Sequence, residues 1–196
     1  MSVEDKKEIR NTTYKVTSDE EKRTVEGYAI LFDTVSDGLP FEETIERGAL
    51  DGVIQKSDVL ALLNHSWNRG VLARSKRGKG SLELIIDEKG LMYRFEAPKT
   101  ALGDELLENI KRGDVDESSF AFTVEKDTWE KNADGKWKRS IKKISEIYDV
   151  SPVYNAAYSA TSVYTRGKEQ AEEELRKHEQ KELDEYWSNI NKQFNF

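Results

Sequence analysis

The sequence predicts a mainly β domain with flanking helices (α+β), built as an antiparallel sheet or barrel, together with a C-terminal helix. Three observations predict it. Short apolar or alternating runs recur along the chain and are separated by turns of hairpin length, which favours antiparallel pairing over a parallel α/β fold. One segment in the body has helical spacing, and the composition changes after residue 166 to charged helix formers.

The domain organisation follows from length and composition. A chain of 196 residues is long enough for one hydrophobic core, and 4 Trp, 8 Tyr and 7 Phe are too many aromatic residues for a disordered chain. We therefore predict a flexible N-terminal segment at 1–22, one domain at 23–166, and a charged helical tail at 167–196.

The predicted elements of the domain follow one another in a simple order. A strand at 24–32, with Gly27 a candidate bulge, leads through a loop at 33–40 to a short strand at 41–45 and a helical turn at 49–54. Further strands are expected at 59–63, 71–72, 81–86, 91–97, 118–124, 137–148 and 150–163, with a basic loop at 74–80 and a hairpin turn at 132–135.

The clearest helix of the domain lies at 100–112. Its apolar side chains recur at helical spacing, and Gly113 stands where a C-cap glycine belongs. The tail is the second helix, because residues 168–192 are dense in helix formers of both charges.

Composition excludes several classes of function. A net charge of −7 disfavours non-specific binding to nucleic acid, which needs Lys and Arg at the phosphates. The chain has no cysteine, so disulfides, thiolate metal sites and a cysteine nucleophile are ruled out. It contains no apolar run of membrane-spanning length, and its polar start is not a signal peptide. We expect no cofactor, no metal and no membrane partner.

The two histidines differ in setting. His178 lies among charged residues of the tail and is expected to be solvated, whereas His65 ends an apolar strand and precedes a turn, where catalytic groups are commonly displayed. A histidine bonded to a nearby carbonyl for purely structural reasons is the alternative for His65. With no cysteine, a covalent catalyst would need Ser, Thr or Lys, and Ser118 and Ser119 begin a strand after a helix and a glycine.

A serine nucleophile needs a histidine base, and the histidine needs a third group to orient it. Glu146 and Asp149 could supply that carboxylate, but they are three residues apart and therefore face opposite sides of a regular strand. Taken alone this set is weak, because a strand serine and a surface carboxylate are common in any domain.

Five segments, in this order along the chain, resemble segments of the tailed-phage prohead proteases, a family of capsid-maturation enzymes related in fold to the herpesvirus assembly protease. They are GYAILFD at 27–33, ERGAL at 46–50, LLNHSWNRGVLAR at 62–74, RGDVDESSFAF at 112–122 and ISEIYDVSPVYNAAYSAT at 144–161. The resemblance implies a herpesvirus-protease type of barrel. The chain departs from the family pattern at Ala73, Ala121 and Asn155.

The resemblance also implies roles for residues. His65 is the expected general base, Ser119 rather than Ser118 the nucleophile, and Asp149 the orienting acid, with Glu146 in reserve. Arg69, Arg74 and nearby backbone amides are candidates for binding the oxyanion.

The implied function is that of a serine endopeptidase inside the immature capsid (prohead), in the host cytoplasm. Its substrates would be scaffolding protein or the scaffold-like part of the major capsid protein, and the enzyme itself by autocleavage. A homo-oligomer is compatible with this function. The alternative is a non-catalytic capsid assembly or scaffolding protein on the same fold, which the long charged tail would suit.

Overall fold

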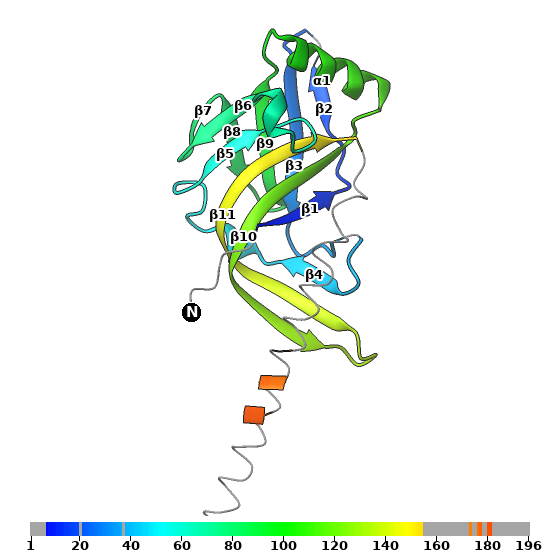
Figure 1. Cartoon of the computed structure of the whole chain (residues 1–196), viewed down its shortest axis with the longest axis vertical. Coiled ribbons are helices and arrows are strands. Elements are labelled where there is room, and N and C mark those ends of the chain that lie inside the picture. The colour runs from blue at the N-terminus through cyan, green and yellow to red at the C-terminus, as the bar shows by residue number, and fades with distance from the viewer. Residues whose placement is uncertain are drawn as a thin grey trace, which may run out of the picture. The chain divides into compact units, whose positions relative to one another are not determined.

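The computed structural model describes residues 7–19, 21–36 and 38–154, together with residues 173, 176–177 and 180–181. The chain divides into two compact units, Met1–Ala160 and Thr161–Phe196. The first unit contains two sheets, and Figure 1 shows that a pair of long, curved strands dominates it.

The larger sheet has seven strands and is mixed. In spatial order it consists of β1 (Glu8–Thr12), β10 (Glu117–Lys131), β11 (Trp137–Val153), β5 (Asp58–Ala61), β6 (Ala73–Lys76) and β7 (Lys79–Gly80), with β4 (Glu42–Ile45) also paired to β11. β4 and β5 run parallel to β11, and the other pairs are antiparallel. β10 and β11 form a long hairpin, closed by Asn132, whose side-chain oxygen accepts bonds from the amides of Asp134 and Lys136.

The smaller sheet is antiparallel throughout. It consists of β2 (Thr17–Asp19), β3 (Thr24–Leu31), β9 (Gly90–Glu96) and β8 (Leu82–Ile86), in that order. The core is apolar and includes Tyr93 of this sheet and the stacked rings of Phe120 and Phe122 of the larger one, whose centroids are 4.7 Å apart.

The prediction of a mainly β fold is confirmed, but the predicted closed antiparallel barrel is not. Among the described residues the strands form two sheets, and two of the pairings are parallel. Alternation of side chains specifies that a segment is a strand, whereas the partner of that strand is decided by long-range packing. The irregularity predicted at Gly27 falls instead between Tyr28 and Ile30, and the predicted basic loop at 74–80 is the β6–β7 hairpin.

The N-terminal segment was predicted to be flexible, and this is wrong for residues 8–12 and 17–19, which form β1 and β2. In β1 the inward side chains are Arg10 and Thr12 rather than apolar residues. Both are buried because they have partners: Arg10 pairs with Glu43, and the Thr12 hydroxyl donates to the Ala29 carbonyl at 2.7 Å. A strand with polar inward residues gives no hydrophobic alternation to detect.

The predicted helix of the domain is present as α1 (Ala101–Arg112). The Thr100 hydroxyl accepts from the amide of Gly103 at 3.3 Å, and Gly113 ends the helix in the left-handed region with φ 77°. The structure also contains two 3₁₀ turns, η1 (Arg47–Leu50) and η2 (Trp67–Arg69), and η1 contacts β11.

The predicted helical tail at 167–196 lies almost wholly outside the described residues. Those that are described, Glu173, Arg176, Lys177, Gln180 and Lys181, have helical backbone, and the extent of the helix stays a prediction. In the described part of the chain, no helix is both long and apolar enough to cross a membrane.

Candidate active site

His65 is placed by the chain that follows β5. This chain continues along β11 after the strand ends, because the amide of Leu62 donates to the Val150 carbonyl at 3.2 Å and that of Asn64 to the Pro152 carbonyl at 2.9 Å. His65 therefore leaves the sheet beside residues 149–152 of β11.

The backbone turns sharply at this point. Asn64 and His65 both have positive φ, 53° and 55°, in the left-handed region that non-glycine residues seldom occupy. Each such residue costs on the order of 1–3 kcal/mol and persists only where the surroundings fix it. Here the two bonds to β11 hold the chain, and the strained turn carries the imidazole over the sheet.

Ser119 lies near the start of β10, where its neighbours in the sheet are Asn11 of β1 and Ser151 of β11. Its side chain shares a face with Ser151, because directly opposed residues of antiparallel strands project to the same side. Ser118 projects to the other face, where its hydroxyl is 2.8 Å from that of buried Tyr93. The structure thus brings Ser119, and not Ser118, to the side where His65 lies.

Asp149 completes a continuous chain of hydrogen bonds. Its Oδ1 is 2.5 Å from His65 Nδ1, and His65 Nε2 is 2.6 Å from Ser119 Oγ. The neutral tautomer that donates Nδ1–H to Asp149 leaves the Nε2 lone pair free to accept the serine proton. Ser151 donates its hydroxyl to the same Asp149 oxygen at 2.9 Å, and Lys7 Nζ is 3.4 Å from the other one.

The electrostatics keep Asp149 ionised although it is fully buried. Burial raises the pKa of its carboxyl, but the hydrogen bond and charge of His65, the charge of Lys7 and the hydroxyl of Ser151 outweigh burial and lower that pKa below its usual value. A buried carboxylate of this kind orients the imidazole and stabilises it once it is protonated.

The other predicted candidates lie elsewhere. Glu146 is opposite Thr123, and the carboxylate that contacts His65 belongs to Asp149. Arg69 pairs with Glu105, and Arg74 pairs with Asp58 through two nitrogens. His178 lies outside the described residues.

Sequence reasoning missed Ser151 and Lys7. Ser151 could have been found, because it follows Asp149 by two residues and so shares its face of the strand. Lys7 carries no such signal, since only the pairing of β1 with β10 brings it near Asp149.

Access to the serine is blocked on the β1 side. Ser119 has no exposed surface, whereas the His65 side chain is 19% exposed. The Ser119 hydroxyl also donates to the Arg10 carbonyl oxygen of β1 at 2.9 Å.

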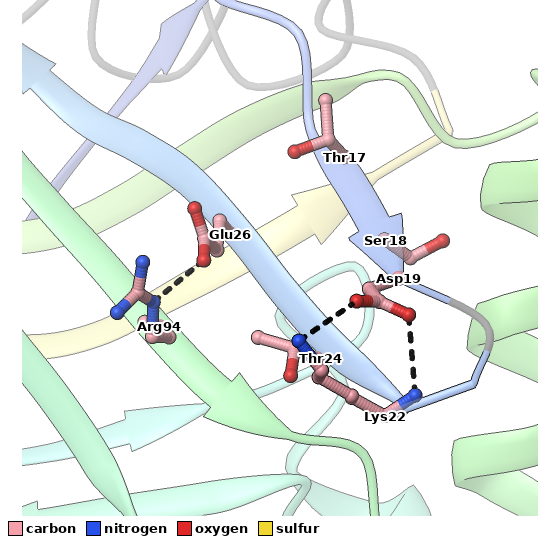
Figure 2. A pocket seen from close by; sticks show the side chains of 7 residues that line it. All are labelled: Thr17, Ser18, Asp19, Lys22, Thr24, Glu26 and Arg94. Carbon is pink, nitrogen blue, oxygen red and sulfur yellow. Dashed lines mark hydrogen bonds and ion pairs between the residues drawn. The ribbon is translucent and has the colours of Figure 1, made fainter.

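A separate surface pocket lies on the smaller sheet. Its volume is about 400 Å³. Figure 2 shows it lined by side chains of β2 and β3, by Lys22 between them, and by Arg94 of β9. The ion pairs Lys22–Asp19 and Arg94–Glu26 cross it, and none of Ser119, His65 and Asp149 lines it.

A serine, a histidine and a carboxylate joined in this order by hydrogen bonds on a mainly β scaffold define a serine-hydrolase type of site. Comparison with known proteins identifies the family: caudovirus prohead serine proteases match residues 12–177, and the chain belongs to that family.

The fold is similar to that of a solved structure. The chain is similar to the capsid assembly protease of bacteriophage T4, gp21, with a TM-score of 0.50 and 12% identity over 76% of this chain and 99% of that one. No curated protein matches the sequence.

Proposed function

We propose that this chain is the serine endopeptidase of capsid maturation in a tailed phage. It cleaves scaffolding protein, or scaffold-like segments of the major capsid protein, and itself, within the immature capsid. The observation that carries the proposal is the unbroken chain of hydrogen bonds from Ser119 Oγ through both nitrogens of His65 to buried Asp149.

In the first half of the reaction, Ser119 Oγ bonds to the scissile carbonyl carbon while its proton passes to His65 Nε2. The imidazolium forms 2.5 Å from the Asp149 carboxylate, which compensates its charge. His65 then gives the proton to the amide nitrogen as the C–N bond breaks. The products are a free amine and an acyl ester on Ser119.

In the second half, water replaces the amine. His65 accepts a proton from the water as its oxygen bonds to the ester carbon, and returns it to Ser119 Oγ as the ester bond breaks. The acid product leaves, and the hydroxyl and neutral imidazole are restored. Ser151 stays bonded to Asp149 throughout and keeps its carboxylate oriented toward Nδ1.

The test is autoprocessing of the full-length chain, and cleavage of co-expressed major capsid protein, followed on gels and by intact mass. Ser119→Ala and His65→Ala should abolish both, and the double variant should be hardly worse than either single one, because the two groups act as a unit. Asp149→Asn should lower the rate by about 10⁴-fold, since an amide favours the wrong tautomer of His65.

Ser118→Ala is the matched control. It removes the neighbouring hydroxyl, which is bonded to Tyr93 on the opposite face, and should leave processing intact. Thermal melts verify that each variant is folded. Processing by folded Ser119→Ala protein would refute the proposed nucleophile. A wild-type chain that cleaves neither substrate and also fails to label at Ser119 with a fluorophosphonate would favour the non-catalytic assembly role.

A further inference from the structure

β1 lies at the edge of the larger sheet, directly beside the serine. In the β1–β10 register, Asn11 is opposite Ser119 and Ile9 is opposite Ala121. Because β1 is the outermost strand, its removal would leave the backbone amides and carbonyls of β10 unpaired at this edge. An unpaired edge accepts an extended peptide as an added strand.

The catalytic face of β1 covers the site. Lys7, Ile9 and Asn11 alternate onto the face that carries Ser119 and Asp149. The ammonium group of Lys7 lies 5.0 Å from the ring centroid of Trp67 and 5.1 Å from that of Tyr148, and it also contacts Asp149. Residues 7–11 therefore extend along the triad in the way that a bound peptide would.

β1 also diverts the serine proton. A hydroxyl has a single proton to donate. When Ser119 donates it to the Arg10 carbonyl, at 2.9 Å, that proton is not available to His65 Nε2. The Arg10 carbonyl thus competes with His65 for the proton of the nucleophile. In addition, Ser119 has no exposed surface, so a substrate carbonyl cannot reach its hydroxyl.

The opposite face of β1 holds the strand in place. Arg10 donates from Nε and Nη2 to the fully buried carboxylate of Glu43, at 2.6 and 2.8 Å, and Thr12 donates to the Ala29 carbonyl. These anchors are polar and specific, and they lie away from the reacting groups. Displacement of β1 would remove the Arg10 carbonyl from Ser119 and Lys7 from Asp149, whereas none of the hydrogen bonds that join Ser119, His65 and Asp149 to one another involves β1.

We propose that residues 7–12 are an internal blocking strand: they occupy the position in which an extended substrate peptide pairs with β10, and the enzyme becomes active when this strand is displaced. The inference rests on the proposed function of Ser119 as nucleophile.

The experiment uses a reversible lock in the full-length chain. The chain has no cysteine, so Ile9→Cys with Ala121→Cys introduces one defined pair. Directly opposed residues of antiparallel strands have Cα atoms about 4.5–5.5 Å apart, within the range for a disulfide. The protein is oxidised with oxidised glutathione or reduced with dithiothreitol, and Ser119 is then labelled with a fluorophosphonate, which bonds to an activated serine oxygen and releases fluoride.

Oxidation should lower the labelling rate by about tenfold or more, because the rate follows the population of the competent, open state, and reduction should restore it. The single variants Ile9→Cys and Ala121→Cys should respond to neither treatment, and Ser119→Ala should not label. Equal labelling of the oxidised and reduced double variant would overturn the blocking strand while leaving the proposed function intact. No labelling of reduced double variant, single variants or wild type would mean that Ser119 is not activated, and the proposed function would fail first.

A second variant gives the opposite perturbation. Arg10→Gln removes the charged anchor to Glu43 and should raise the labelling rate above that of wild type, with Arg74→Gln, an exposed arginine of β6, as control. An unchanged rate in Arg10→Gln protein that melts cooperatively would contradict the role of β1.

Discussion

Arg139→Met tests how a buried cluster of charges stabilises the larger sheet. We call Glu8, Arg10, Glu43, Asp127 and Arg139 the ion cluster. Arg139 is its centre: it donates to Glu8 at 2.7 and 2.9 Å, to Glu43 at 2.9 Å and to Asp127 at 2.6 Å, and its side chain is only 9% exposed. It thereby joins β1, β4, β10 and β11.

The magnitude follows from the charges left behind. The cluster has three carboxylates and two guanidinium groups, a net charge of −1, and without Arg139 it has three carboxylates and one guanidinium, a net charge of −2. Removing one partner from a buried ion pair costs about 3–5 kcal/mol, because the remaining charge is uncompensated. For a domain of about 150 residues this corresponds to a fall in melting temperature of about 6–20 °C.

The loss should shrink as the pH falls. Burial raises the pKa of Glu8, but the hydrogen bond and charge of Arg139, with help from Arg10, lower it overall. In wild type the stability that Glu8 contributes is present above its unfolded pKa and is lost as the pH falls through its folded pKa. Without Arg139 the folded carboxylates bind protons at higher pH, so the variant should lose less stability than wild type between pH 7 and pH 4.

The assay is thermal unfolding followed by circular dichroism at both pH values, with Arg74→Met as the matched control. Arg74 also pairs with a carboxylate through two nitrogens, but its side chain is 53% exposed, so its removal should change the melting temperature little. Equal shifts for the two variants, or a larger shift for Arg139→Met at pH 4 than at pH 7, would refute the reasoning.

Two further predictions concern Gly27 and Asp149. Gly27→Ala should destabilise the fold by about 1–3 kcal/mol, because the added Cβ would lie 2.5 Å from the Tyr93 hydroxyl oxygen and 2.8 Å from Ser118 Oγ. Gly48→Ala, whose nearest neighbour is 3.8 Å away, is the control, and similar melts for the two would contradict the clash. Since the pKa of Asp149 is lowered in the folded state, the stability it contributes is lost as the pH falls below its unfolded value of about 3.9. The melting temperature of Asp149→Asn should therefore fall less between pH 5 and pH 3 than that of wild type. Equal falls in the two proteins would contradict this prediction.

Local features of the fold could be predicted from the sequence because their causes are local. Helix α1 is set by its apolar spacing, by Thr100 before it and by Gly113 after it, and the structure has it at Ala101–Arg112. Most strands of the body are present for the same reason. The parallel pairing of β4 and β5 with β11 was not predictable, because no periodicity within a strand records its neighbour.

The residues of the candidate site could be predicted only in part. Ser119 and Asp149 are 54 and 84 residues from His65 along the chain, so in the sequence only the order of the motifs connects the three residues. The register explains why Asp149 rather than Glu146 contacts the histidine, because Asp149 is opposite Ala121, whereas Glu146 is opposite Thr123, farther along β10 from Ser119. The strand pleat puts Asp149 and Ser151 on the face of Ser119.

β1 shows why the state of the site could not be predicted along with its residues. The hydrogen bond that blocks Ser119 joins positions 109 residues apart and uses a backbone carbonyl, which any residue at position 10 would provide. What makes residue 10 particular is its side chain, which pairs with Glu43 on the opposite face and so fixes the register. A charged residue in a polar N-terminal segment has the appearance of a solvated tail, yet burial with its partner gives it a positional role. The same pleat that directs Arg10 into the ion cluster directs Ile9 and Asn11 over the triad. One face of β1 therefore anchors the strand, and the opposite face blocks the site.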